Sequence, residues 1–102
     1  MRRSTIGLLL LTALLTGCGL AGEPTMSADN YDRSCSADEE CALVYEGNIC
    51  LCGQPAAISQ EALDRWEGVL DRKRGRCQGV AKCEPDFAEA ACQSGTCRAV
   101  DP

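Results

Sequence analysis

Histidine is absent from this 102-residue chain, and aromatic side chains are scarce, with one tryptophan, two tyrosines and one phenylalanine. The lack of histidine excludes Ser–His and Cys–His nucleophile pairs and removes the commonest metal ligand. The adjacent carboxylates Asp38, Glu39 and Glu40 are more typical of an exposed capping turn than of an acid–base pair, which needs one buried partner. A domain this small also has little volume for a pocket of about 300 Å³. We therefore expect no enzymatic activity and no cofactor.

The chain also lacks an apolar run of the roughly 20 residues that a membrane-spanning helix needs. Its apolar run, from Ile6 to Leu15, is shorter and follows a positively charged start at Arg2 and Arg3. This order of a basic region, a short apolar region and small residues is typical of a secretory signal peptide. The sequence predicts that residues 1–17 are such a signal.

The residues at the end of this run, Leu15-Thr16-Gly17-Cys18, resemble the bacterial lipobox. The resemblance implies that the Cys18 thiol carries a diacylglyceryl group and that signal peptidase cuts between Gly17 and Cys18. Acyl chains contribute ~0.8 kcal/mol per buried CH₂, so two or three of them hold a protein firmly in membrane lipid. Gly19, rather than aspartate, follows the cysteine, and the sorting rule for such proteins then implies the outer membrane in a cell with two. We expect a lipid-anchored protein of the cell envelope.

Nine cysteines give an odd count, which acylation of Cys18 makes even. Eight cysteines in a short exported chain predict four disulfides. The alternative, two four-cysteine zinc sites, is disfavoured by export and by the absence of any cysteine pair with a two-residue gap. We therefore expect no metal site. The eight predicted disulfide cysteines are Cys35, Cys41, Cys50, Cys52, Cys77, Cys83, Cys92 and Cys97.

Negative charge predominates from Cys18 onwards, where 8 basic residues face 15 acidic ones and give a net charge of −7. Such a surface binds nucleic acid poorly and is repelled by anionic head groups. The exception is a basic cluster formed by Arg72, Lys73, Arg74 and Arg76. A membrane or nucleic-acid site is one interpretation of this cluster. We favour the other, in which these cations complement the dipole at the end of a helix.

The chain divides after the signal into a lipidated N-terminus with a flexible tether, residues 18–34, and a cysteine-rich domain, residues 35–102. The tether is small and polar and shows neither helical nor strand periodicity. The alternative is that this segment forms a strand that joins the domain through Tyr31. For the domain, the sequence predicts a small disulfide-rich α+β fold with one central helix and two β-hairpins.

In the first half of the domain, Ser34 or Ser36 is expected to cap a short helical turn, with Asp38, Glu39 and Glu40 near its N-terminus. A hairpin with strands at 42–45 and 49–52 and a turn at 46–48 is expected to follow. Cys50 and Cys52 would lie on one face of the second strand, so each should bond to a different distant partner.

The helix is predicted to begin at an N-cap, Ser59, and to stop at Gly75 in a left-handed conformation. Trp66 lies on its apolar stripe and is expected in the core. The stripe consists of Ala62, Leu63, Trp66, Val69 and Leu70.

Ser94-Gly95 predicts a two-residue turn between strands near 90–93 and 96–100. Gln93 and Thr96 would close this hairpin, which places Cys92 opposite Cys97. A local Cys92–Cys97 disulfide is then one outcome. In the other, both cysteines bond to Cys41, Cys50 or Cys52 and tie the two hairpins together. Sequence alone cannot choose among the 105 possible pairings.

The pattern from Cys35 to Cys97 resembles a bacterial family called the eight-cysteine-cluster domain. The resemblance rests on Cys35…Asp38…Cys41, on Cys50-Leu51-Cys52, on Ala57-Ile58-Ser59 and on Cys92-Gln93-Ser94-Gly95-Thr96-Cys97. It implies an exported scaffold, often lipidated, and implies no activity.

Two functions remain open after these exclusions. The first is an interaction module held at the membrane, with an unknown protein or other envelope partner and no nucleic acid. The second is a proteinase inhibitor that presents Gly47-Asn48 or Glu84-Pro85-Asp86 as its binding loop.

Overall fold

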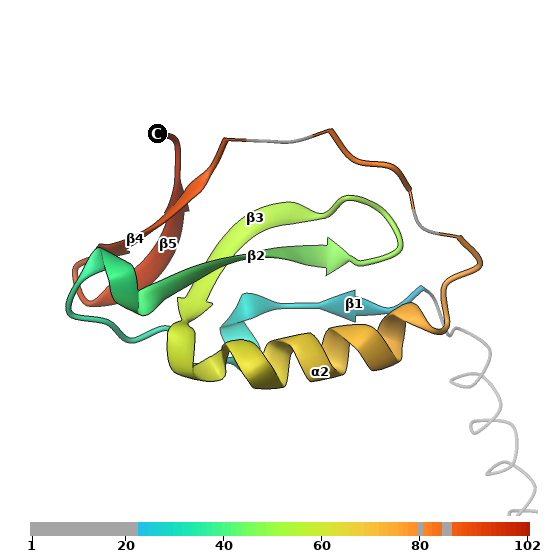
Figure 1. Cartoon of the computed structure of the whole chain (residues 1–102), viewed down its shortest axis with the longest axis horizontal. Helices are drawn as coiled ribbons and strands as arrows, with labels where there is room; N and C mark the ends of the chain where they lie inside the picture. Colours follow the sequence, from blue (N-terminus) through green and yellow to red (C-terminus); the bar gives the residue numbers. More distant parts are fainter. Residues whose placement is uncertain (1–22, 80, 85–86) are drawn as a thin grey trace, which may run out of the picture.

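The computed structural model describes residues 23–79, 81–84 and 87–102. Three strands form one antiparallel sheet in the order β1-β2-β3, from β1 (Thr25–Met26), β2 (Cys41–Asn48) and β3 (Gln54–Ser59). A second sheet is the antiparallel hairpin of β4 (Glu89–Gln93) and β5 (Thr96–Val100). The helix α2 (Leu63–Arg74) runs along the three-stranded sheet, as Figure 1 shows. The predicted disulfide-rich α+β fold, with one main helix and two hairpins, is confirmed within the described residues.

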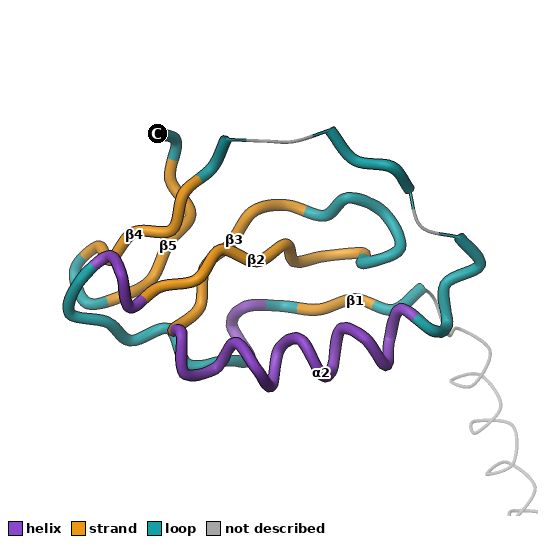
Figure 2. The backbone as a smooth tube through the Cα atoms, in the orientation of Figure 1, coloured by secondary structure: helices purple, strands orange, loops and turns teal. Residues whose placement is uncertain are grey.

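Short 3-10 turns connect these elements (Figure 2). They are η2 (Ala28–Asn30), η3 (Asp38–Glu40) and η4 (Gln60–Ala62). The expected short helical turn is present as η3, but its N-cap is Ala37 and no side chain caps it. Instead the Glu40 carboxylate accepts a hydrogen bond from the Ser36 backbone N–H at 2.7 Å.

The three-stranded sheet has core residues on both faces. Successive side chains of a strand point to opposite faces, so neighbouring residues of β3 join different clusters. On β3, Ala56 and Ile58 face the larger core cluster, where Trp66 of α2 is 2% exposed. Ala57, between them, faces a second cluster, which contains Cys41 of β2 and Cys97 of β5. The helix and the β4–β5 hairpin therefore pack against opposite faces of the same strand. The prediction that Trp66 belongs to the core is confirmed.

The first hairpin has a different register from the one that the sequence predicts. The predicted strand at 49–52 is wrong, because β2 continues to Asn48 and the partner strand β3 lies at Gln54–Ser59. Residues 49–53 form the connecting loop. β3 contains Pro55, which is tolerated because β3 is an edge strand of its sheet.

Both predicted ends of the helix need correction. Ser59 precedes η4 rather than α2, and its side chain makes no capping bond. The residue that caps the start of α2 is Ala62. At the other end Gly75 has φ −61°, so the helix ends there without the left-handed conformation that the sequence suggested.

The prediction of a flexible tether over residues 18–34 is wrong for residues 23–34, while residues 18–22 lie outside the described part. Thr25 and Met26 pair with the end of β2, and Met26 and Ala28 are buried in the larger core cluster. Tyr31 packs edge-on against Trp66, with ring centroids 5.0 Å apart. The folded domain therefore includes this segment. Spaced small residues such as Ala28 bury without producing a visible period, which is why the pattern looked like a tether.

Candidate functional site

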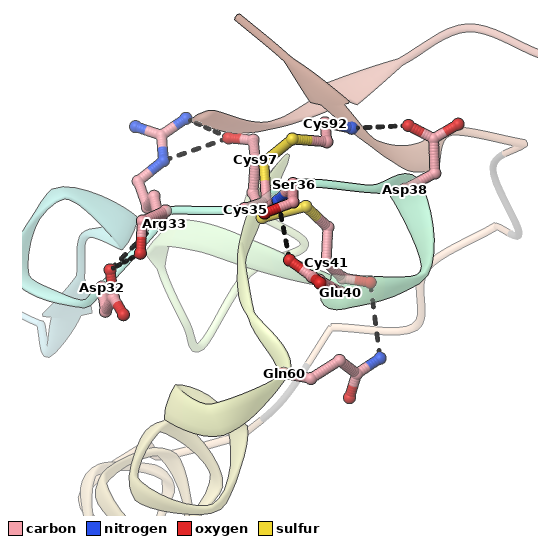
Figure 3. Close-up of a disulfide and its surroundings, with 11 residues drawn as sticks. Asp32, Arg33, Cys35, Ser36, Asp38, Glu40, Cys41, Gln60, Cys92 and Cys97 are labelled. Carbon is pink, nitrogen blue, oxygen red and sulfur yellow. Dashed lines mark hydrogen bonds between the residues drawn. A yellow bond between two sulfur atoms is a disulfide. The ribbon is translucent and has the colours of Figure 1, made fainter. Parts of the chain in front are cut away.

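Four disulfides fix the geometry of the domain, as predicted, and they form two parallel pairs. The first pair joins Cys35 to Cys92 and Cys41 to Cys97, with Cα atoms 5.9 and 5.5 Å apart. It attaches the segment before β2 to the β4–β5 hairpin (Figure 3). The Sγ atoms of Cys35, Cys41 and Cys97 lie within 4.8 Å of one another, so the two disulfides are direct neighbours. Three clustered sulfurs resemble a metal site in spacing, but all three are bonded to other sulfurs.

The turn of the second hairpin is confirmed, and the local disulfide is wrong. Gln93 pairs with Thr96, and Cys92 lies opposite Cys97, as the Ser94-Gly95 turn predicts. Nevertheless each cysteine bonds to a residue before or at the start of β2. The bond of Cys97 to Cys41 agrees with the predicted alternative, in which the cysteines of the second hairpin bond to the first hairpin. Cys92 bonds Cys35, which that alternative did not name.

Hydrogen bonds between side chains and the backbone support the same junction. The Asp38 carboxylate accepts from the Cys92 N–H at 2.8 Å, so η3 holds β4 directly. The guanidinium of Arg33 donates to the Cys97 carbonyl, at 2.9 Å from Nη2. Charged donors and acceptors make these the stronger hydrogen bonds of the domain. Asp38, which the sequence placed on an exposed turn, is exposed but also has this structural role.

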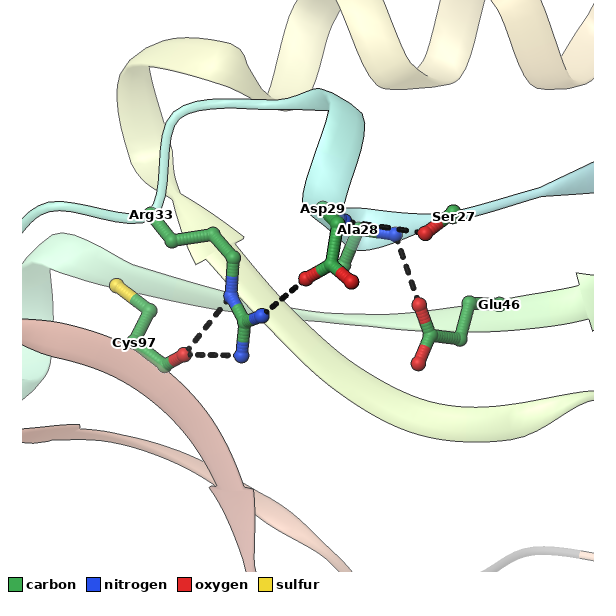
Figure 4. A network of polar contacts seen from close by, with 6 residues as sticks. All are labelled: Ser27, Ala28, Asp29, Arg33, Glu46 and Cys97. Atoms are coloured by element: carbon green, nitrogen blue, oxygen red, sulfur yellow. Dashed lines mark hydrogen bonds and ion pairs between the residues drawn. The ribbon is translucent and has the colours of Figure 1, made fainter.

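The N-terminal segment is held by polar contacts as well as by burial (Figure 4). Glu46 of β2 accepts from the Ala28 N–H at 2.8 Å, and Asp29 forms an ion pair with Arg33 at 2.7 Å. Asp32 accepts from both the backbone N–H and the hydroxyl of Ser34, at 3.0 and 2.7 Å. The Ser34 backbone bond is the main reason why the pKa of Asp32 lies below its ordinary value.

The second pair of disulfides frames the loop of the first hairpin. Cys50 bonds Cys77 and Cys52 bonds Cys83, so each bonds to a different distant partner as predicted. The Ala81 N–H also donates to the Cys50 carbonyl at 3.1 Å. These links hold the chain that follows α2 against the 49–53 loop.

A cleft of about 530 Å³ lies between this loop, β2 and the inner face of α2. Our expectation of no pocket above about 300 Å³ is therefore wrong. Residues of the 49–53 loop and of the segment after α2, which the two disulfides join, line this cleft together with residues of β2 and α2. Leu51, at the rim, is 55% exposed. The apolar residues of the lining include Leu43, Ile49, Leu51, Leu63, Trp66 and Leu70, and the charged ones are Glu67, Arg74 and Glu84.

The lining of this cleft suits it to binding an apolar group. Apolar lining with a few polar groups at the rim is the usual character of a binding pocket. The sequence analysis did not identify this cleft, because its lining residues come from segments far apart in sequence.

The other predicted site residues are placed as follows. Gly47 and Asn48, one of the suggested inhibitor loops, are wrong for that role because both are paired with β1. The second, Glu84-Pro85-Asp86, lies partly outside the described residues, and so do Gly17 and Cys18. No helix within the described residues is long and apolar enough to cross a membrane.

Comparison of the chain with protein-family models, with curated proteins and with solved structures finds no match.

Proposed function

We propose that this protein is a lipoprotein of the bacterial cell envelope, in which acylated Cys18 supplies the anchor and the disulfide-stapled domain binds an envelope partner. The observation that carries the binding role is the apolar cleft beside the 49–53 loop. Two disulfides, at Cys50 and Cys52, tie that loop to the segment after α2 and restrict its movement. Preorganisation of this kind lowers the entropy cost of binding. The partner's matching feature is an apolar side chain or segment, and no catalytic step is proposed.

The anchor is tested by changing Cys18→Ala and labelling cells with palmitate. Acylation at this thiol predicts that the label disappears and that uncleaved precursor accumulates. The matched control is Cys52→Ala, which removes a cysteine of an exposed disulfide and should keep the label. A palmitate label that persists in the Cys18→Ala protein would show that the anchor is elsewhere. Fractionation then tests the outer-membrane prediction separately.

The cleft is tested by placing a photoreactive phenylalanine analogue at position 51 and, as a control, at position 87. Leu51 lines the cleft, whereas Phe87 is 78% exposed and does not line it. We expect a discrete cross-linked adduct in living cells from position 51 alone. Equal adducts from both positions, or none from position 51, would contradict a binding role for the cleft.

A proteinase inhibitor is the second candidate. Phe87 favours it, because a large exposed aromatic residue between Cys83 and Cys92 has the character of a protease-binding anchor. A panel of serine and cysteine proteinases tests this candidate, with Phe87→Ala as the variant. Inhibition that Phe87→Ala abolishes would establish it, and a panel without inhibition would remove it.

A further inference from the structure

The charges of this domain are distributed unevenly along its length. Of the eight basic residues from Cys18 onwards, five lie in residues 72–82, a stretch without any acidic residue. Arg72, Arg74 and Arg76 are exposed and Lys73 is half-buried. We call these four residues the basic end. In the part of the chain that the structure describes, none of them forms an ion pair.

The basic end lies where the chain enters the domain. Lys73 donates a hydrogen bond from Nζ to the Thr25 carbonyl at 2.7 Å, which fixes the start of β1 beside the end of α2. Glu23, the first described residue, accepts a hydrogen bond from Asn48 at 2.7 Å in the same region. Figure 1 shows the start of β1 and the C-terminal end of α2 next to each other.

The short distance along the chain from Cys18 restricts how the domain can face the membrane. Glu23 is five residues after Cys18, and five residues span at most about 18 Å when fully extended. That length is comparable to two Debye lengths at physiological ionic strength, each about 8 Å. Residues 18–22 are therefore short enough to keep the end that carries Glu23 near the membrane, and this end can approach the head groups to within one Debye length, where their charges act.

The opposite end is acidic. Asp38, Glu39 and Glu40 form the exposed turn η3, which Figure 1 shows at the other end of the domain from the last turn of α2. An anionic surface attracts the basic end and repels this turn, and both effects favour the same orientation. The four cations of the basic end thus lie far from the η3 carboxylates, although Glu23 and Asp71 lie near them and reduce the local positive charge.

We infer that the basic end binds the anionic phospholipid head groups of the membrane that anchors Cys18, and that this contact orients the domain with its acidic turn outward. The inference rests on the proposed anchor. Complementarity with the helix dipole explains Arg72, Lys73 and Arg74, since it acts within the last turn. It does not explain Arg76 or Lys82, because both residues lie beyond the end of the helix at Arg74.

The test supplies the anchor chemically, so that it does not depend on acylation in the cell. The chain from Cys18 onwards contains every described strand, α2 and all four disulfides, and is expected to fold by itself. Its Cys18 thiol is coupled to a maleimide phospholipid in vesicles of phosphatidylcholine, with or without about 30% phosphatidylglycerol. The measurement is the rate of tryptic cleavage after Arg76 and, for comparison, after Arg98 in β5.

Phosphatidylglycerol should slow cleavage after Arg76 at least fivefold, about the effect of one basic residue at an anionic surface, and leave Arg98 unchanged. About 0.5 M NaCl should restore cleavage. The variant Arg72→Glu/Arg74→Glu should lose the protection, whereas Arg65→Glu/Arg98→Glu, with the same change of charge, should keep protection at Arg76. Equal rates in both vesicles, or equal slowing at Arg76 and Arg98, would overturn the inference. Failure of palmitate labelling, by contrast, would overturn the anchor alone.

Discussion

Removal of the buried disulfide between Cys41 and Cys97 gives the sharpest test of how this domain is stabilised. The bond closes a separation of 56 residues, which as a lone cross-link would contribute ~4 kcal/mol by reducing the entropy of the unfolded chain. The neighbouring bond between Cys35 and Cys92 lowers this contribution, because it keeps the same two segments close together in the unfolded chain.

With the Cys35–Cys92 bond intact, the loop that Cys41–Cys97 closes is much shorter. It consists of seven residues from Cys35 to Cys41 and six from Cys92 to Cys97. A loop of that size corresponds to ~3 kcal/mol. Burial adds to this, since Cys97 is 0% and Cys41 5% exposed, and we estimate the packing loss on truncation as ~1 kcal/mol. The Cys41→Ala/Cys97→Ala variant should therefore lose ~4 kcal/mol, of which ~3 is chain entropy.

A matched control separates the two contributions. Cys35→Ala/Cys92→Ala opens the same short loop, but both of its cysteines are only half-buried. It should lose ~3 kcal/mol, and removing both bonds should lose ~7–8 kcal/mol, because the last bond to go closes the long loop.

The assay is equilibrium unfolding in guanidinium chloride without reductant, followed by Trp66 fluorescence. A Cys18→Ser background removes the free thiol that would exchange disulfides. A Cys35/Cys92 variant that is as destabilised as the Cys41/Cys97 variant would refute the burial argument. A loss well above 4 kcal/mol for the half-buried pair would refute the short-loop argument.

Three further predictions concern single residues. Tyr31→Ala should lower the free energy of unfolding by ~2 kcal/mol by removing the contact with Trp66, and an unchanged denaturation midpoint would mean that this segment is not part of the fold. The pKa of Asp32 in the folded state lies below its unfolded value of about 3.9. The stability that this carboxylate contributes is therefore present above pH 3.9 and is lost as the pH falls through the folded pKa. Asp32→Asn should flatten the acid limb of a stability–pH curve, and an identical limb would contradict this. Gly53→Ala should destabilise by ~2 kcal/mol in thermal denaturation, because φ is +68° and the new Cβ would lie 2.6 Å from a backbone oxygen, whereas Gly79→Ala, with open space around it, should be neutral.

Local chemistry was enough to predict the features whose partners are close in sequence. Ser94-Gly95 fixed the second hairpin and its register, because both residues adopt the positive φ that a two-residue turn requires. The spacing of apolar residues indicated α2 and placed Trp66 inside. The number of cysteines predicted four disulfides, since the count alone reflects compartment and size.

Features with distant partners depended on tertiary structure. β3 has two alanines and a proline in place of good strand formers, and it is a strand because β2 and the second hairpin pack on it. The segment at 23–34 is ordered by Glu46, Trp66 and Cys97, which come from three other elements. Propensity and periodicity are read from short windows of sequence, and these windows contain none of the distant residues that order β3 and the 23–34 segment.

The pairing of the cysteines illustrates the same division. Register placed Cys92 opposite Cys97, which made a local bond geometrically possible from sequence. Packing of the second hairpin on β3 brought Cys41 and Cys35 to the same place, and bonds to these residues tie two sheets together. The sequence by itself thus determined which cysteines are cross-linked and where the second hairpin turns, and it predicts export. The three-dimensional fold decided which sulfurs meet, which loop stays open as a cleft, and that the basic end of α2 lies beside the entry of the chain, because each of these depends on contacts between residues far apart in sequence.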